Sequence, residues 1–391
     1  MNYILFDGPY RDNLLPFTYT KPVADLRIGI LTIREKWELF LKTTTTTFTE
    51  DYLSEKYPMV ELENNVMINA SVIPSKDLVE QIKSLKHNQA IFYNEVLIAF
   101  FSLSDVETID FELFYKINLN EEPIIIKNTW DIFSNNGIAL QRDYEKITEG
   151  RKSLPIPDSV NVVNPEQIFI EEGAILNFVT INASKGPVYI GKNSEIMEGS
   201  IIRGPLALCE GAVLKLGTKI YGPTTVGPYS KVGGEVNNSV ISGYSNKGHD
   251  GFLGNSVIGE WCNLGADTNT SNLKNNYAEV RLWDYESGRF ASTGLQFCGL
   301  MMGDHSKCAI NTMFNTGTVV GVCANIFGSG FPRNFIPSFS WGGSQGFTTY
   351  LTSKAFEVAK IVMSRRNIEF TEQDEYILTT IFNQTEAFRK S

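Results

Sequence analysis

The chain has 391 residues, of which 42% are apolar and 20% are charged, a balance typical of an ordinary folded protein with two or three domains. Its acidic residues outnumber its basic ones by 44 to 34, which gives a formal net charge of −10, and no basic patch stands out in the sequence. These properties argue against a nucleic-acid partner.

Nothing in the sequence predicts a membrane segment or an exported protein. The longest apolar stretch, 90–103, is interrupted by Asn94 and Glu95 and is shorter than the roughly 20 residues that cross a bilayer. The first residues show no basic segment followed by an apolar core, so we expect a cytoplasmic protein. The five cysteines form no C-x-x-C pair, which predicts reduced, space-filling thiols rather than a disulfide framework or a zinc ribbon.

Residues 1–155 are expected to form an α/β domain, because short apolar strands alternate with helical patterns. The predicted strands cover 3–6, 90–92, 96–101 and 123–126, and the predicted helices cover 30–41 and 76–85. The segment 151–157 contains two prolines and is the predicted linker to the next domain.

The middle of the chain repeats an aliphatic residue every six positions. Eight such residues stand in one column: Ile190, Ile196, Ile202, Leu208, Leu214, Ile220, Val226 and Val232. The same step is predicted upstream at Ile170 and Leu176, and downstream at Phe252, Ile258, Leu264, Ile310, Thr316 and Val322. A six-residue step fits one short strand and one corner, whereas a helix has a period of about 3.6 and an alternating strand a period of about two. We therefore predict a parallel β-helix over 156–346, in which each coil buries its column residues against the next coil.

Residues 347–391 are expected to form a helical tail. Phe356, Ala359 and Met363 share one helical face, and Thr371 can cap a second helix in which Ile377 and Ile381 are aligned. Such a tail would cover an end of the β-helix or a neighbouring subunit.

His249 is the leading catalytic candidate. It lies between Gly248 and Gly251 at a predicted coil corner, which would expose its imidazole. Histidine has the unperturbed pKa closest to neutrality, so it can take a proton from an attacking amine or hydroxyl. A three-histidine zinc site is not expected, because the chain contains three histidines and no two are close in the sequence.

The surroundings of His249 resemble a known family. The stretches Ser245-Asn-Lys-Gly-His249 and Gly259-Glu-Trp-Cys-Asn263-Leu-Gly-Ala266-Asp-Thr-Asn-Thr-Ser-Asn272 look like the acetyltransferase half of the bifunctional N-acetylglucosamine-1-phosphate uridylyltransferase/glucosamine-1-phosphate acetyltransferase family. The resemblance implies a left-handed parallel β-helix with His249 as general base. It also implies that Asn263 and Asn272 bind the amino sugar and the acetyl group, and that Gly265 and Ala266 line the acetyl-CoA site.

Three residues depart from the family pattern. Phe252 stands where the family usually has a tyrosine that contacts the sugar phosphate, so substrate preference would differ, and Asp267 replaces a glycine. Lys231 lies near the position of a phosphate-binding arginine, but lysine is a point charge rather than a bidentate fork. A solvated corner lysine is an equally open interpretation of Lys231.

The stretch Arg11-Asp-Asn-Leu-Leu-Pro16-Phe-Thr18-Tyr-Thr20-Lys21-Pro22 resembles the L-x-P-x-T segment of sugar nucleotidyltransferases. The glycine-rich phosphate loop of those enzymes is reduced here to Asp7-Gly8. The resemblance implies that Arg11 and Lys21 neutralise a nucleoside triphosphate and that Asp131 holds a Mg²⁺ ion. The alternative is that these are surface charges on a degenerate domain.

Together these features predict a sugar-phosphate transferase. Its β-helix would move acetyl from acetyl-CoA to an amino-sugar 1-phosphate such as glucosamine 1-phosphate, and its N-terminal domain would form a UDP- or dTDP-sugar. The resemblance implies a homotrimer. Two alternatives stay open: a nucleotidyltransferase whose β-helix is only an assembly platform, and a non-catalytic scaffold that binds sugar nucleotides.

Overall fold

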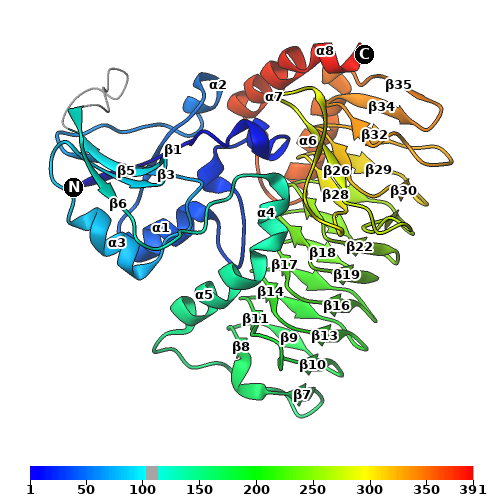
Figure 1. Ribbon diagram of the computed structural model, residues 1–391. Helices are drawn as coiled ribbons and strands as arrows, with labels where there is room; N and C mark the ends of the chain where they lie inside the picture. The colour runs from blue at the N-terminus through cyan, green and yellow to red at the C-terminus, as the bar shows by residue number, and fades with distance from the viewer. Residues whose placement is uncertain (103–112, 391) are drawn as a thin grey trace.

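The computed structural model describes residues 1–102 and 113–390. An N-terminal α/β part lies against the side of a long β-helix, and the C-terminal helices lie near the end of the β-helix that is farthest from β7 (Figure 1). None of the described helices is long and apolar enough to cross a membrane.

The N-terminal part is built on a six-stranded mixed sheet with the order β2-β1-β3-β5-β4-β6. Its strands are β1 (Asn2–Phe6), β2 (Thr46–Phe48), β3 (Asn65–Asn69), β4 (Gln89–Tyr93), β5 (Val96–Ser102) and β6 (Tyr115–Asn118). β1 is parallel to β2 and β3, whereas β5 is antiparallel to β3 and β4. The helices of this part are α1 (Ile33–Leu41), α2 (Asp51–Ser54), α3 (Lys76–Lys83), α4 (Thr129–Ser134) and α5 (Asn136–Thr148), with short 3₁₀ helices η1 (Asp12–Leu14), η2 (Phe17–Tyr19) and η3 (Val23–Asp25).

Three of the four predicted strands and both predicted helices of this part are confirmed. α1 begins at Ile33, after Thr32, because the Thr32 side chain accepts a hydrogen bond from the Glu35 amide while the Glu35 carboxylate accepts one from the Thr32 amide. The strand predicted at 123–126 is wrong. Ile125 forms an isolated antiparallel bridge with Val72 instead, and a proline at 123 has no N–H to donate to a ladder.

The β-helix has three faces, and each strand pairs in parallel with the strand of the next coil on the same face. The first face contains β7 (Asn161–Val163), β10 (Thr180–Asn182), β13 (Ile201–Arg203), β16 (Lys219–Tyr221), β19 (Glu235–Asn237) and β22 (Phe252–Gly254). The second contains β8 (Ile168–Ile170), β11 (Val188–Ile190), β14 (Leu206–Leu208), β17 (Thr224–Val226), β20 (Val240–Ile241), β23 (Val257–Ile258), β28 (Leu300–Met302), β31 (Thr318–Val320) and β33 (Phe335–Ile336). The third contains β9 (Ile175–Leu176), β12 (Glu195–Ile196), β15 (Val213–Leu214), β18 (Lys231–Val232), β21 (Asn246–Lys247), β24 (Asn263–Leu264), β29 (Lys307–Cys308), β32 (Asn325–Ile326) and β34 (Ser340–Gly343), and ends on antiparallel β35 (Gly346–Thr349).

β25 (Asn269–Thr270) pairs in parallel with β30 (Met313–Phe314) of the next coil. A long insertion between β25 and β28 contains a hairpin of β26 (Arg281–Asp284) and β27 (Arg289–Ser292). The tail contains α6 (Thr352–Ser364), α7 (Glu372–Gln384) and α8 (Glu386–Arg389), and Thr371 caps α7 as predicted.

The predicted parallel β-helix is confirmed, and its repeat has a simple geometric meaning. All eight residues of the central column are at most 1% exposed. Consecutive members lie on consecutive faces, so that Ile190 pairs with Leu208, three column positions later. Six residues therefore make one face, and three faces make one coil. The five cysteines are buried and unpaired, as predicted.

In the later coils the six-residue step predicts the wrong interior residues, because these coils differ in length and an insertion precedes β28. Leu253, rather than Phe252, points inward and pairs with Val236. Ile310 is 65% exposed, and Cys308 and Phe314 take the interior positions. The predicted interior roles of Phe252 and Ile310 are therefore wrong.

Leu214→Ala is expected to lower the free energy of unfolding by about 2–5 kcal/mol. The side chain of Leu214 is fully buried between Ile196 and Val232 of the neighbouring coils, so its removal leaves a cavity. Leu216→Ala is the matched control, because Leu216 is 68% exposed; we expect it to change stability by no more than about 0.5 kcal/mol. Urea unfolding followed by circular dichroism measures both, and equal losses would contradict the inward orientation of Leu214.

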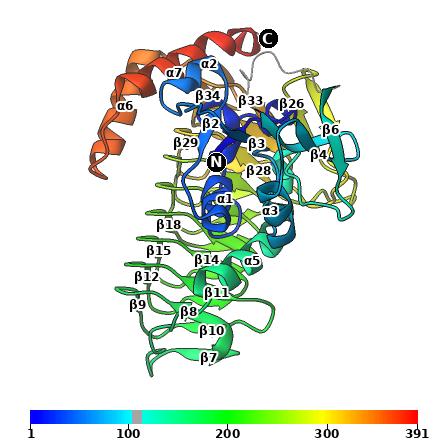
Figure 2. The ribbon, with the colours of Figure 1, turned by 90° about the vertical axis from the view of Figure 1, so that its left-hand side faces the viewer.

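The N-terminal part is fixed to the side of the β-helix by buried contacts. α4 and α5 lie against β23 and β17 (Figures 1 and 2). Thr225 Oγ1 donates to Gly29 O at 2.8 Å, and Cys209 Sγ lies 3.5 Å from Ile30 O. The loop around residues 29–30 is thus packed against the β-helix.

Candidate active site

His249 is exposed at the corner between β21 on the third face and β22 on the first. The corner is tight, because Gly251 has a φ of +116° and a Cβ on it would lie 2.1 Å from Thr268 O. Only glycine fits such a position without displacing the backbone. The sequence Gly-His-Asp-Gly therefore places an imidazole on the outside of the coil, as predicted.

Lys247, two residues before His249, points into the β-helix. It occupies the position that Val232 has in the preceding coil, and it is 3% exposed. Its Nζ donates to Gly233 O at 2.9 Å and to His249 O at 2.7 Å. Burial lowers the pKa of Lys247 to about 8. The ammonium group ties the backbone of His249 to the preceding coil. This role was not predicted, although a lysine in an aliphatic column is visible in the sequence.

A cavity of about 930 Å³ opens beside His249. Five predicted site residues line it: Lys231, His249, Asn263, Gly265 and Ala266. Its other walls come from Lys215, Tyr244, Trp261, Lys307, the exposed Ile310, and Val358, Val362, Arg365 and Arg366 in and just after α6. The participation of α6 could not be predicted, because the sequence gives no sign of where the tail packs.

Phe252 and Asn272 lie outside the lining of this cavity, near the first face. Both approach Gly254, where a Cβ would lie 2.5 Å from the Phe252 ring and 2.6 Å from Asn272 Nδ2. Asn272 Nδ2 donates to Asn255 Oδ1 at 2.8 Å. The His249 corner therefore separates the predicted substrate residues into two groups within one chain.

A second, smaller cavity of about 330 Å³ lies at the carboxyl ends of the parallel strands β1 and β2, where α/β sheets commonly bind ligands. Arg11 lines it, and its Nη2 donates to Thr18 O at 2.8 Å and to Tyr52 Oη at 2.9 Å. Asp7 also lines it, and burial raises the pKa of that carboxyl. Of the predicted nucleotide ligands, Arg11 is thus the one that reaches this cavity.

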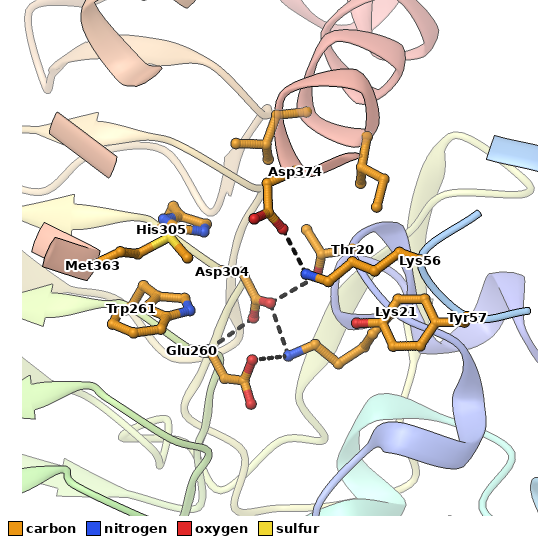
Figure 3. Close-up of a pocket in the computed structure, with 12 residues that line it drawn as sticks. Thr20, Lys21, Lys56, Tyr57, Glu260, Trp261, Asp304, His305, Met363 and Asp374 are labelled. Carbon is orange, nitrogen blue, oxygen red and sulfur yellow. Dashed lines mark hydrogen bonds and ion pairs between the residues drawn. The ribbon is translucent and has the colours of Figure 1, made fainter. Parts of the chain in front are cut away.

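Lys21 lies instead in a buried ionic cluster between the N-terminal part and the β-helix (Figure 3). Its Nζ is 2.7 Å from Glu260 Oε2 and 2.9 Å from Asp304 Oδ2, and Thr20 Oγ1 donates to Asp304 Oδ2 at 2.7 Å. Beside it, Lys56 Nζ is 2.5 Å from a carboxylate of α7, that of Asp374. The ammonium of Lys21 is therefore engaged with carboxylates rather than open to a phosphate.

Asp131 is the helix-capping carboxylate of α4. Its Oδ2 accepts from the backbone amides of Lys127 and Asn128, each at 2.9 Å. Across the described ranges, no three His, Cys, Asp or Glu side chains are grouped so that they could hold a metal ion. His305 stacks on Trp261, and burial lowers its pKa to about 3, which keeps the imidazole neutral.

The fold and the cavity define a chain with two parts, an α/β part and a β-helix with an exposed histidine above a basic cavity. Residues 3–152 match the family described as "Sugar nucleotidyl transferase". The chain is 32% identical to a bifunctional sugar-1-phosphate nucleotidylyltransferase/acetyltransferase of Sulfurisphaera tokodaii, over 49% of this chain and 55% of that protein. It is 33% identical to a bifunctional protein GlmU of Methanocaldococcus jannaschii, over 49% of this chain and 40% of that protein.

The chain thus spans about half the length of the curated relatives that it matches. Among solved structures, the polySia-specific acetyltransferase NeuO matches with a TM-score of 0.25 and 12% identity, over 52% of this chain and 100% of that one. The sequence relatives confirm the resemblance found above: the chain is similar to proteins that combine a sugar nucleotidyltransferase with an acetyltransferase.

Proposed function

We propose that the chain is a sugar-phosphate transferase whose β-helix moves the acetyl group of acetyl-CoA to the amine of an amino-sugar 1-phosphate, with glucosamine 1-phosphate as the expected acceptor. The observation that carries this proposal is the exposed His249 on the rim of a large cavity that also contains Asn263, Gly265 and Ala266. The bifunctional relatives support the same activity.

The chemistry follows from the position of the imidazole. His249 takes a proton from the sugar amine while the amine nitrogen attacks the thioester carbonyl, which gives a tetrahedral intermediate. Its collapse breaks the carbon–sulfur bond, and the imidazolium returns the proton to the leaving thiolate, so that the products are the N-acetyl sugar phosphate and free coenzyme A. Asn263 holds substrate beside the imidazole, and Lys247 fixes the corner that carries it.

The N-terminal part is proposed to transfer a nucleotidyl group to the acetylated sugar 1-phosphate and so to form a UDP- or dTDP-sugar. Arg11 at the carboxyl end of β1 would meet the triphosphate. The residues do not fit a resident Mg²⁺ ion, since Asp131 Oδ2 already accepts two backbone N–H groups and Asp7 accepts from Val23 N and Thr49 Oγ1.

One observation favours a second function for the N-terminal part. Arg11, Lys21 and Asp131, the residues predicted to bind the nucleotide and its Mg²⁺ ion, are all engaged in contacts within the chain. The N-terminal part would then bind a sugar nucleotide without turning it over.

Two assays test the proposal on the purified 391-residue chain. Release of free coenzyme A is expected from acetyl-CoA and glucosamine 1-phosphate, and its absence would contradict the acetyltransferase. Release of pyrophosphate is expected from UTP or dTTP with N-acetylglucosamine 1-phosphate. Nucleotide-sugar binding without pyrophosphate release would support the non-catalytic alternative for the N-terminal part.

A cytoplasmic homotrimer is the proposed assembly. A neighbouring copy that brings its Phe252 and Asn272 to the His249 cavity would reunite the two groups of substrate residues. Light scattering on the eluted protein measures the oligomeric state.

A further inference from the structure

The His249 cavity concentrates positive charge on an acidic protein. The whole chain carries a formal charge of −10, yet Lys215, Lys231, Lys307, Arg365 and Arg366 all line this cavity. Among the described residues of its lining there is no aspartate or glutamate. A cleft lined by charges of one sign attracts ligands of the opposite charge. This cavity should therefore attract a ligand that carries several negative charges.

The cations fall on both sides of His249. On the third face, β15 and β18 supply Lys215, just after β15, and Lys231, while β29 supplies Lys307. β21 and β24 lie between these strands in the sheet. The strand just before His249 thus lies between the lysine pair and Lys307, whose Nζ donates to His305 O at 2.9 Å and to Trp261 O at 3.5 Å.

The wall formed by α6 has the composition of an acyl-donor site. Val358, Val362, Arg365 and Arg366 line the cavity at helical spacing, so one face of α6 and the residues directly after it look into it. Val358 and Val362 share the cavity with Ile310, which is 65% exposed. An apolar strip that ends in arginines matches an acyl pantetheine arm that ends in phosphates, and arginine binds phosphate by paired hydrogen bonds.

We propose that α6 forms the donor-binding wall of the site: Arg365 and Arg366 bind the phosphates of acyl-CoA, and Lys215 and Lys231 are left for the phosphate of the sugar. This inference rests on the proposed acetyl transfer, and it assigns to the C-terminal tail a role in selecting phosphate-bearing donors. The same cations could instead serve only the sugar phosphate, so the test separates the two sources of phosphate.

The test compares the unmodified chain with its Arg365→Ala/Arg366→Ala variant, using acetyl-CoA and the phosphate-free donor S-acetylpantetheine. The KM for acetyl-CoA is expected to rise at least about tenfold, since each arginine loses a charged hydrogen bond. The KM values for S-acetylpantetheine and for glucosamine 1-phosphate are expected to stay unchanged. Equal effects on both donors, or a rise confined to the sugar phosphate, would overturn the proposal.

Binding of adenosine 3′,5′-bisphosphate, measured by calorimetry, gives a readout that does not need turnover. Weaker binding in the double variant supports the donor wall even if no acetyl transfer occurs, and unchanged binding overturns it. Lys354→Ala is the control on the same helix. Lys354 pairs with Glu357 at 3.1 Å and lies outside the cavity, so it should alter neither measurement.

Discussion

His249→Ala is expected to lower the rate of acetyl transfer by about 10²–10⁴-fold, the usual contribution of a positioned general base. The amine cannot attack the thioester efficiently unless a group removes its proton, and His249 is the exposed base on the rim of the cavity. Nucleotidyl transfer should be unaffected, because its proposed site is the N-terminal cavity. Release of coenzyme A and of pyrophosphate measures the two activities in one preparation.

His87→Ala is the matched control, because His87 is exposed on the N-terminal part, where its ring contacts Phe101. It should leave acetyl transfer at the level of the unmodified chain. If the His249 variant still released coenzyme A at that level, the β-helix would serve another purpose, and assembly would become the better explanation of it.

Lys21→Met is expected to lower the free energy of unfolding by about 3–5 kcal/mol, the usual cost of leaving a buried charge without its partner. The substitution removes the cation from between two carboxylates, and Asp304 is almost fully buried. Lys354→Met is the control, because its pair with Glu357 is exposed to solvent. Such a surface pair contributes at most about 1 kcal/mol. Urea unfolding at neutral pH measures both variants.

The effect of Lys21→Met should depend on pH. Burial by itself would raise the pKa of Asp304, but the Lys21 ammonium and hydrogen bonds from Thr20 and the Glu260 amide outweigh it and hold that pKa below its usual value. A carboxyl with a lowered pKa stabilises the fold above its unfolded pKa of about 3.9, and this contribution is lost as the pH falls through the folded pKa. The stability difference between the two proteins should therefore shrink in acid. A difference of the same size at pH 7 and pH 3 would show that the ion pair is not its cause.

Repetition made the β-helix predictable. Each column residue is fixed by the coil directly above or below it, so the six-residue step alone identifies the interior and the corner that exposes His249. The same rule failed at Ile310, because a change in coil length shifts the register without a local signal. Its side chain lies in the cavity wall rather than in the interior.

The rest of the site depends on contacts between distant segments, which one sequence does not reveal. Thr20 and Asp304 are 284 residues apart and share a hydrogen bond. Arg365 and Arg366 reach the cavity only because the tail folds back along the β-helix. Lys21 was predicted to meet a triphosphate because its motif resembles a segment of sugar nucleotidyltransferases. In the structure two carboxylates of the β-helix contact its ammonium.

A stack of coils would ordinarily open from its ends, since each coil touches only its neighbours. Here the N-terminal part contacts several coils along that stack and links them to one another. It holds Cys209 and Thr225 through the 29–30 loop, Asp304 through Lys21, and the tail through the pair of Lys56 and Asp374. We therefore expect the coils between these points to separate only after the N-terminal part has detached.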